Sequence, residues 1–272
     1  MLLQLTNNNL KKYGGKSVSK TALITGATSG IGAAYAKRLA SQGYDLILTG
    51  RRQEIIQKLA DDLIKQFNIK VKVIIAELSE DSDIQKVVDV IKTTEHLEIL
   101  INNAGYAGPF ILFARQHPME IERMTKVIVN VPMRLTYAAL PEMTKNGHGT
   151  IINMASGAAF LPNKKWAVYG AGKAFLKSFS ESLYLEVKND GIKVQVVCPG
   201  PVDTDLWKNM PADKAIMSKR FKFMSPESVV DSSLRDLKKN RIVCVPGTTT
   251  KFLMALVSFL PRSYIYKIAD KE

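Results

Sequence analysis

Two residues in one predicted helix have the types and the spacing that proton transfer would need. The segment YGAGK places a phenol, Tyr169, four residues before an ammonium, Lys173. Side chains four residues apart lie on the same face of a helix, so the charge of Lys173 can act on the Tyr169 hydroxyl. A further hydroxyl, Ser156, ends the strand candidate INMAS thirteen residues earlier. These three residues are therefore candidates for chemistry on a bound molecule.

The same predicted helix contains a second pair with the same spacing, Tyr184 and Lys188 in YLEVK. This pair has no strand-ending hydroxyl before it, and it lies about 22 Å further along the helix at 1.5 Å per residue. The first pair also encloses two glycines, which stabilise a helix poorly but let a flat ligand lie close to it. We therefore interpret Tyr184 and Lys188 as ordinary helix residues.

Short runs rich in β-branched residues alternate with longer amphipathic segments and must position these side chains. The strand candidates are residues 21–26, 44–50, 71–76, 98–102, 149–155, 192–198 and 241–245. The helix candidates are residues 31–43, 53–67, 81–94, 118–145 and 166–190. Apolar strands separated by helices predict an α/β fold, a parallel sheet covered on both faces, with ligands outside the carboxyl ends of the strands.

A glycine-rich turn, TGATSGIG, joins the first predicted strand to the first predicted helix. Its glycines are Gly26, Gly30 and Gly32, in the spacing GxxxGxG. Glycine allows a sharp turn and close approach of a pyrophosphate, and the N–H groups of the following helix favour an anion. The position of this turn indicates a site for the phosphates of a nucleotide.

The second predicted strand ends in TGRRQE, which places Arg51 and Arg52 where an NAD(H)-binding chain would present Asp or Glu. Guanidinium groups suit a 2′-phosphate by charge and by bidentate geometry. The sequence therefore favours NADP(H) over NAD(H), unless the two arginines only open the next helix in solvent.

Composition and charge exclude several classes of protein. The net charge of +13 is distributed along the 272 residues without an arginine-rich arm, which indicates a solvated basic surface and no nucleic-acid partner. Cys198 and Cys244 lie in apolar runs and are expected to be reduced core residues. His96, His117 and His148 are isolated from one another, so we expect no metal site.

Six signals in chain order make the sequence resemble the short-chain dehydrogenase/reductase family in its single-domain form. They are TGATSGIG (25–32), NNAG (102–105), Asn130 in VIVNV, Ser156, Tyr169 with Lys173, and Pro199 with Gly200. The resemblance covers nearly the whole chain, from Lys20 to about Val245. It implies a Rossmann-type, doubly wound, seven-stranded and mostly parallel sheet with helices on both faces.

The resemblance also implies catalytic roles. Tyr169 would be the general acid when a carbonyl is reduced and the base when an alcohol is oxidised, and Ser156 would hydrogen-bond the substrate oxygen. Lys173 would hold the nicotinamide ribose, and Asn130 would link to it through a water in a proton relay. A free tyrosine has a pKa near ~10, and a close ammonium and the charge of the oxidised nicotinamide both favour its ionisation. The hydride moves between cofactor and substrate carbon.

Cofactor contacts follow from the same resemblance. They are Gly26, Ser29, Gly30, Ile31 and Gly32 at the pyrophosphate, Arg51 and Arg52 at the 2′-phosphate, Leu78, Asn103, Ala104 and Gly105 on the adenosine side, and Pro199, Gly200, Val202 and Thr204 with Tyr169 and Lys173 on the nicotinamide side. One position departs from the family pattern, because Glu77 stands where an Asp commonly contacts adenine. A contact by Glu77 stays open, whereas Leu78 can keep a main-chain role.

We expect an N-terminal extension, residues 1–19, of unreadable role, and one domain over residues 20–272 with a substrate loop at 203–225. The segments YAGPFILFARQ and GAAFLPNKKW join this loop on the substrate side, and all three are apolar with interspersed lysines. They predict a mostly hydrophobic ketone or ketoacyl substrate, with a phosphate-bearing carrier near three lysines, Lys164, Lys165 and Lys208. Whether Trp166 and Trp207 face substrate or only pack is open.

The C-terminal tail, residues 249–272, is apolar with cations at Lys251, Arg262 and Lys267. It could lie on an anionic membrane surface as a peripheral contact, or form an interface or core helix. Its apolar run FLMALVSFL is far shorter than the ~20 residues of a spanning helix, so we expect no membrane crossing and a cytoplasmic or membrane-peripheral location. The helices at 118–145 and 166–189 resemble those that assemble family homodimers and homotetramers.

Two classes of function fit these features. The first is an NADPH-dependent oxidoreductase that acts on a carbonyl or secondary alcohol. The second is a catalytically silent NADP(H)-binding protein that senses redox state or binds a partner. We favour the enzyme, because a silent protein has no physical reason to keep all four candidate catalytic residues.

Overall fold

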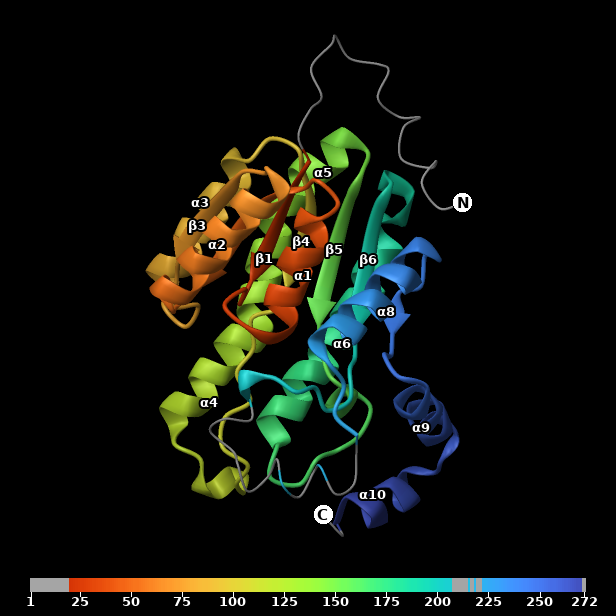
Figure 1. Ribbon diagram of the computed structural model, residues 1–272. Coiled ribbons are helices and arrows are strands. Elements are labelled where there is room, and N and C mark those ends of the chain that lie inside the picture. Colours follow the sequence, from red (N-terminus) through yellow and green to blue (C-terminus); the bar gives the residue numbers. More distant parts are fainter. Residues whose placement is uncertain (1–19, 207–214, 216–217, 219–221, 271–272) are drawn as a thin grey trace.

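Seven parallel strands form one sheet in the computed structural model, which describes residues 20–206, 215, 218 and 222–270 (Figure 1). The strands are β1 (Thr21–Thr25), β2 (Asp45–Gly50), β3 (Val71–Ile75), β4 (Leu97–Asn102), β5 (Gly149–Met154), β6 (Ile192–Val197) and β7 (Val243–Cys244). Their order in the sheet is β3-β2-β1-β4-β5-β6-β7, and every pair is parallel. The Rossmann-type fold expected from the sequence is confirmed, with a sheet that is parallel throughout.

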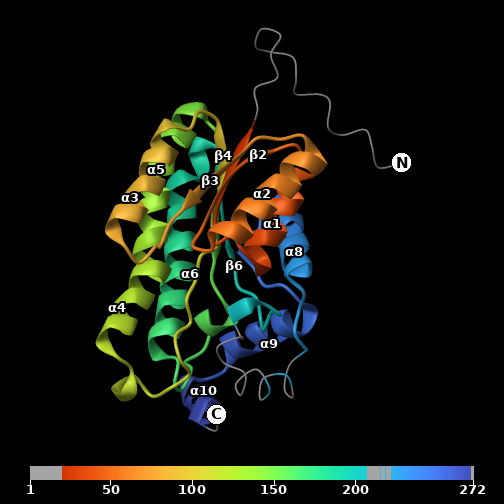
Figure 2. The same cartoon turned by 60° about the vertical axis from the view of Figure 1, so that its left-hand side comes forward.

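Helices cover both faces of this sheet (Figure 2). They are α1 (Gly30–Ala40), α2 (Gln53–Phe67), α3 (Asp81–Thr93), α4 (Pro118–Thr125), α5 (Val131–Asn146), α6 (Ala167–Val187), α8 (Pro226–Lys238), α9 (Thr248–Phe259) and α10 (Arg262–Asp270). One apolar core packs α1, α2 and α8 on one face of the sheet, and a second packs α3, α5 and α6 on the other. Helix α8 was not among the predicted elements, although Ser225 caps it and Pro226 opens it.

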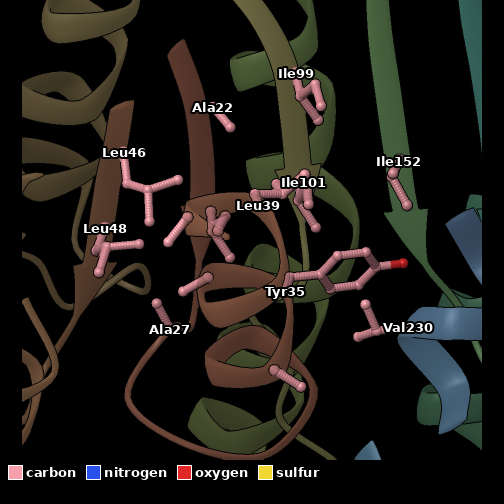
Figure 3. Packing of buried hydrophobic residues seen from close by; sticks show 14 of the residues in the cluster. Ala22, Ala27, Tyr35, Leu39, Leu46, Leu48, Ile99, Ile101, Ile152 and Val230 are labelled. Carbon is pink, nitrogen blue, oxygen red and sulfur yellow. The ribbon is translucent and has the colours of Figure 1, made fainter. Parts of the chain in front are cut away.

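The core beneath α1 contains one buried polar connection. Tyr35 is fully buried among Leu39, Ile101 and Val230 (Figure 3). Its hydroxyl donates to Ser233 Oγ at 2.6 Å, and Ser233 donates to Gln195 Oε1 at 2.6 Å. Burial raises the pKa of Tyr35, so the phenol stays protonated and joins α1, α8 and β6.

The chain reverses its direction of winding between β1 and β4. The strand β1 pairs with β2 on one side and with β4 on the other, so the connections that leave these strands diverge. In open parallel sheets, ligands bind at such a switch point, outside the carboxyl ends of the strands. The glycine-rich turn and the NNAG segment both lie there, because they follow β1 and β4 directly.

The predicted helix at 118–145 is interrupted by one π-helical turn, Lys126–Asn130. The N–H of Val131 donates to the carbonyl of Lys126, five residues back, and Pro132 has no N–H to donate to the carbonyl of Ile128. A π turn adds a residue to the helix and therefore changes which side chains face inward.

The C-terminal tail forms the helices α9 and α10, at the end of the molecule to which the strands point (Figure 1). Among the described residues, no helix combines the length and apolarity that crossing a bilayer requires.

Candidate active site

The glycine-rich turn leaves the N-terminus of α1 open. Gly26 has φ 67° and Gly30 has φ 56°, conformations that favour glycine. A Cβ on Gly32 would lie 2.3 Å from the carbonyl oxygen of Gly26. Ser29 is the N-cap but makes no capping hydrogen bond, and the first turn of α1 has no acidic residue. The first N–H groups of α1 are therefore available to an anion.

Three connections hold the strand ends around this turn. The Nδ2 of Asn103, after β4, donates to the carbonyls of Thr25 at 2.9 Å and Gly26 at 3.2 Å, and the N–H of Ala104 donates to Thr25 Oγ1 at 2.9 Å. A Cβ on Gly30 would lie 2.8 Å from Thr204 Cγ2, so the segment after β6 packs onto the turn. The strand ends predicted to share a site are thus brought together.

The two arginines after β2 lie in different surroundings. Arg52 donates to the hydroxyls of Thr28 at 2.9 Å and Ser29 at 2.7 Å, and to Asp205 Oδ2 at 2.8 Å. Arg52 therefore lies on the glycine-rich turn itself. Arg51 instead donates to Glu77 Oε2 at 3.0 Å.

Glu77, whose contact with adenine was left open, is held by cations. Its Oε2 accepts from Arg51 and also from Arg123 at 3.1 Å, and its Oε1 accepts from Ser79. Burial raises the pKa of Glu77, but the hydrogen bonds from Arg51 and Ser79 outweigh it and hold the pKa below its ordinary value. The carboxylate stays charged and offsets one of the two arginines. Leu78 is buried in the core.

Ser156 and Tyr169 meet after β5. Ser156 follows the strand in an extended conformation, and its Oγ accepts from the N–H of Ala158 at the start of a short 3₁₀ turn, Gly157–Ala159. Tyr169, in the first turn of α6, is 8% exposed. Burial raises the pKa of Tyr169, and a hydrogen bond between the Ser156 and Tyr169 side chains acts in the opposite direction. Near neutral pH this phenol is protonated and can donate.

Lys173 is the buried cation of the site. It is 4% exposed, and its Nζ donates to the carbonyl of Met154, the last residue of β5, at 2.6 Å. The Nζ lies 5.7 Å from the centre of the Tyr169 ring and 3.7 Å from the place a Cβ on Gly105 would take. Burial lowers the pKa of Lys173 to about 8. Lys188, in the second pair, is exposed, and Tyr184 packs against the core.

A chain of buried hydrogen bonds holds the elements beneath the site. Asn102 in β4 donates to Asn153 Oδ1 at 2.8 Å, and Asn153 in β5 donates to Ser180 Oγ at 2.9 Å. Ser180 then donates to the carbonyl of Leu176 at 2.6 Å within α6. Because β4, β5 and α6 are linked in this way, α6 is fixed relative to the strand ends that carry the site.

Asn130, which the resemblance implies to be linked to Lys173 through a water, lies where the π turn meets α5, and its role stays a prediction. Asn130 ends the π turn with an exposed side chain. Two positions earlier, Ile128 is buried and packs with Tyr169, and its Cγ2 would lie 2.9 Å from a Cβ on Gly172. Residues two apart in a helix point to nearly opposite sides, so the side chain of Asn130 takes no part in this apolar contact with α6.

Aromatic side chains line the substrate side of Tyr169. The Trp166 ring lies 5.0 Å from the ring of Phe110 and 5.0 Å from the ring of Tyr169, measured between centroids. Trp166 therefore lies against the Tyr169 ring as well as against Phe110. Sequence reasoning left Trp166 open and did not single out Phe110, whose role depends on a loop between β4 and α4.

The lysines proposed for a phosphate-bearing carrier have other contacts. Lys164 Nζ lies 2.9 Å from Asp270 Oδ1, and Lys165 Nζ lies 5.3 Å from the centre of the Phe110 ring. Lys208 and Trp207 lie outside the described residues.

The segment after β6 packs against the loop that follows β5 and against α9. The carbonyl of Pro199 accepts from the N–H of Gly157 at 2.8 Å. Val202 is buried and forms a bridge with Met224, which joins the two ends of the predicted substrate loop. A Cβ on Gly200 would lie 2.9 Å from Thr250 Oγ1, so α9 begins against this turn.

Among the described residues, no group of three or more His, Cys, Asp and Glu side chains could hold a metal ion. Cys198 and Cys244 are buried free thiols. The structure brings together a phenol, a hydroxyl and an ammonium where β5 ends and α6 begins.

Comparison with known proteins agrees with this geometry. A family model described as short chain dehydrogenase matches residues 20–215. A very-long-chain 3-oxoacyl-CoA reductase of Anas platyrhynchos is 30% identical over 262 residues, which cover 94% of this chain and 81% of that protein.

Two solved structures extend the comparison. A short-chain dehydrogenase from Sphingobium yanoikuyae in complex with NADPH is 32% identical with a TM-score of 0.80, over 89% of this chain and 96% of that chain. A bulky-bulky ketone specific alcohol dehydrogenase from Comamonas testosteroni is 30% identical with a TM-score of 0.76, over 89% of this chain and 95% of that chain.

The buried ammonium of Lys173 predicts a specific pH dependence of stability. Between about pH 8 and the ordinary lysine pKa, the unfolded chain holds a proton that the folded chain has released. The free energy of unfolding of the wild type should therefore rise with pH in this window, by about 1–3 kcal/mol more than that of Lys173→Met. Below about pH 8 the difference between the two proteins should not change with pH. Urea unfolding at pH 7 and at higher pH values measures it.

Lys188→Met, at the exposed end of the same helix, is the matched control. Its free energy of unfolding should change with pH in the same way as that of the wild type. Parallel curves for the wild type and Lys173→Met across the whole range would show that the ammonium is not buried.

Proposed function

Because the chain belongs to the short-chain dehydrogenase/reductase family, whose members act on CH–OH or C=O groups with a nicotinamide cofactor, we propose that it is an NADPH-dependent reductase of hydrophobic ketones or ketoacyl groups. The observation that carries this proposal is the buried Tyr169 phenol, hydrogen-bonded to Ser156 and adjacent to the Lys173 ammonium.

The residues at the switch point fit a dinucleotide. The uncapped N-terminus of α1, with glycine at 26, 30 and 32, suits a pyrophosphate, and Arg52 lies directly over the hydroxyls of Thr28 and Ser29. Asn103, Ala104 and Gly105 follow β4 on one side of this turn, where they would hold the adenosine half. The residues after β6 would hold the nicotinamide half; they are Pro199, Gly200, Val202 and Thr204. Ile31 would support the glycine-rich turn, and Leu78 supports the core. When bound, the cofactor supplies the hydride.

The site residues then divide the remaining work. Tyr169 donates the proton of its Oη to the substrate oxygen, because its raised pKa keeps the phenol protonated near neutral pH. Ser156 hydrogen-bonds the same oxygen and orients it. Lys173 places a positive charge near Tyr169, which lowers the cost of the phenolate that forms, and its ammonium would reach the nicotinamide ribose. Asn130 would be linked to Lys173 through a water in a proton relay.

The preference for NADPH rests on Arg52. Each arginine shares its charge with one carboxylate, Arg52 with Asp205 and Arg51 with Glu77, but only Arg52 is held on the glycine-rich turn, where it can meet a 2′-phosphate with little rearrangement. The NADPH complex of the Sphingobium yanoikuyae relative supports this choice.

The substrate class rests on the aromatic lining and on the relatives. The rings of Phe110 and Trp166 offer apolar surface beside Tyr169, which suits a bulky hydrophobic carbonyl. One relative is named for very-long-chain 3-oxoacyl-CoA and another for ketones that are bulky on both sides, and both are apolar carbonyl compounds.

Buried free thiols also suit a reducing compartment such as the cytoplasm.

We further propose that the chain assembles as a homodimer or homotetramer through α4 and α6. An apolar hollow of about 550 Å³ lies between them, and its lining includes Phe113, Ile121, Val129, Val168 and Phe175. A second copy would cover this surface, as large exposed apolar hollows usually mark interaction sites.

Replacement of Tyr169 by Phe tests the reductase. Oxidation of NADPH with bulky ketones or ketoacyl thioesters should fall by about 10²–10⁴-fold, because the proton donor is lost. The NADPH dissociation constant, measured by fluorescence, should change little. Tyr184→Phe, on the same helix, is the control and should keep full activity.

Undiminished turnover in Tyr169→Phe would contradict the assigned role. Tight NADPH binding without turnover by the wild type on any carbonyl of the panel would instead favour the alternative of a silent NADP(H)-binding protein.

Replacement of Arg52 by Ala tests the cofactor preference. The KM for NADPH should rise by about 10–100-fold and the KM for NADH by less than about threefold, because the charge-assisted contact with the 2′-phosphate is lost. Arg38→Ala, which removes a surface arginine paired with Asp231, is the control. An equal effect of Arg52→Ala on both cofactors would refute the assignment.

Replacement of Phe175 by Asp tests the assembly. A carboxylate in the apolar hollow should reduce the sedimentation coefficient to that of a smaller assembly, since a desolvated charge without a partner is costly. Ile55→Asp, at an exposed position on α2, should leave it unchanged. A wild type that sediments as a monomer would refute the assembly.

A further inference from the structure

The helix α9 is apolar on its outer face as well as on its inner face. Met254 and Val257 are buried against the domain. Phe252, Leu256 and Phe259, spaced four and three residues apart, form a stripe on the outside that is 73%, 48% and 86% exposed. A helix that is apolar on all sides is normally covered on all sides. The outer stripe therefore calls for a cover that the described part of the chain does not supply.

Exposed cations and tyrosines lie on the same two C-terminal helices as this stripe. Lys251 lies in the first turn of α9, and α10 presents exposed Tyr264 and Tyr266 with Arg262 and Lys267. Within residues 248–270 the sequence contains a single acidic residue, at position 270. Two helices that combine an apolar stripe with basic side chains and tyrosines have the composition of surfaces that enter the interfacial layer of anionic membranes.

Both helices are attached to loops of the active site. The first turn of α9 packs through Thr250 against Gly200, after β6. The end of α10 is joined by the Lys164–Asp270 ion pair to the loop that also carries Ser156 and Trp166. Both helices lie at the end of the molecule toward which the strands point, on which the substrate side also lies (Figures 1 and 2). A surface that covered the stripe would therefore lie beside the substrate side of the site.

We propose that α9 and α10 form a membrane-docking surface. Phe252, Leu256 and Phe259 enter the apolar part of the headgroup layer, while Lys251, Arg262 and Lys267 contact anionic headgroups. The docked enzyme takes its carbonyl substrate from the lipid phase, a step that rests on the proposed function.

A second copy of the chain fits this surface less well than a lipid surface does. In a two-fold symmetric contact the same patch meets itself, so the three cations of one copy would approach those of the other. Like charges brought together at an interface repel one another. An anionic lipid surface instead fits both features, because its headgroups complement the cations and its apolar layer accepts the stripe.

The test is flotation of the full-length protein with vesicles, either of phosphatidylcholine alone or of phosphatidylcholine with phosphatidylserine. The wild type should float with the anionic vesicles and less with the neutral ones. The double variant Phe252→Ser/Phe259→Ser should bind at least about tenfold more weakly, because it loses most of the inserted apolar area. The triple variant Lys251→Gln/Arg262→Gln/Lys267→Gln should lose the preference for anionic vesicles.

The matched control is Ile55→Ser/Ile64→Ser, which removes two exposed apolar side chains from α2, away from the C-terminal helices. It should bind vesicles like the wild type. A wild type that does not float, or a Phe252→Ser/Phe259→Ser variant that floats as well as the control, would overturn the proposal. So would a wild type that floats with neither vesicle but whose sedimentation coefficient falls in that variant, because the stripe would then join two copies.

A second readout separates docking from catalysis. With a water-soluble ketone, the wild type and the Phe252→Ser/Phe259→Ser variant should oxidise NADPH at similar rates. With an apolar ketone dissolved in anionic vesicles, the variant should oxidise NADPH more slowly than the wild type. The rate should fall by about the same factor as the affinity of the variant for the vesicles. If the wild type turns over neither ketone but its flotation depends on the two phenylalanines, docking stands and the proposed function fails.

Discussion

The site depends on a positive charge that the fold holds away from water. The ammonium of Lys173 donates to the last carbonyl of β5, so its position is set by the strand and not by solvent. Burial of a cation is unfavourable by itself, which is why its pKa falls to about 8. The same burial leaves little water between this charge and Tyr169, one helical turn earlier, whose ring centre lies 5.7 Å from the Nζ.

The surrounding structure serves to keep this charge and the phenol in place. The hydrogen bonds from Asn102 through Asn153 to Ser180 fix α6 against the strands. The close contact of Ile128 with Gly172 fixes it from the other side. The chain shares this fold with proteins about one third identical to it.

The two ends of the site have different physical characters. The phosphate end is polar, with an open helix N-terminus and Arg52 held on the turn. The substrate end is aromatic, and the helices α9 and α10 are attached to its loops. Phosphates and an apolar carbonyl thus have separate surroundings, with Tyr169 near the point at which they would meet.

Local patterns predicted most of the fold and the central site. The strands were predicted within one residue at their ends, except the last, which was predicted at 241–245 and is only Val243–Cys244. The pair Tyr169–Lys173 was predicted because residues four apart on a helix must share a face. The π turn at 126–130 was not predicted, and it changes which side chains of this segment face α6, where Ile128 packs. Arg123 was not found, because it reaches Glu77 across 46 residues of sequence.

The most direct test of the central claim is the pH dependence of alcohol oxidation by the wild type in single turnovers with saturating NADP⁺. Tyr169 would be the base in this direction, and its phenol is protonated near neutral pH. Only the ionised fraction of Tyr169 can therefore take the proton of the alcohol. The rate should rise by about tenfold per pH unit until the phenol of the loaded enzyme is ionised, and then level off. A rate that is independent of pH from slightly acidic to strongly alkaline solution would contradict the account, because no phenol would then take the proton.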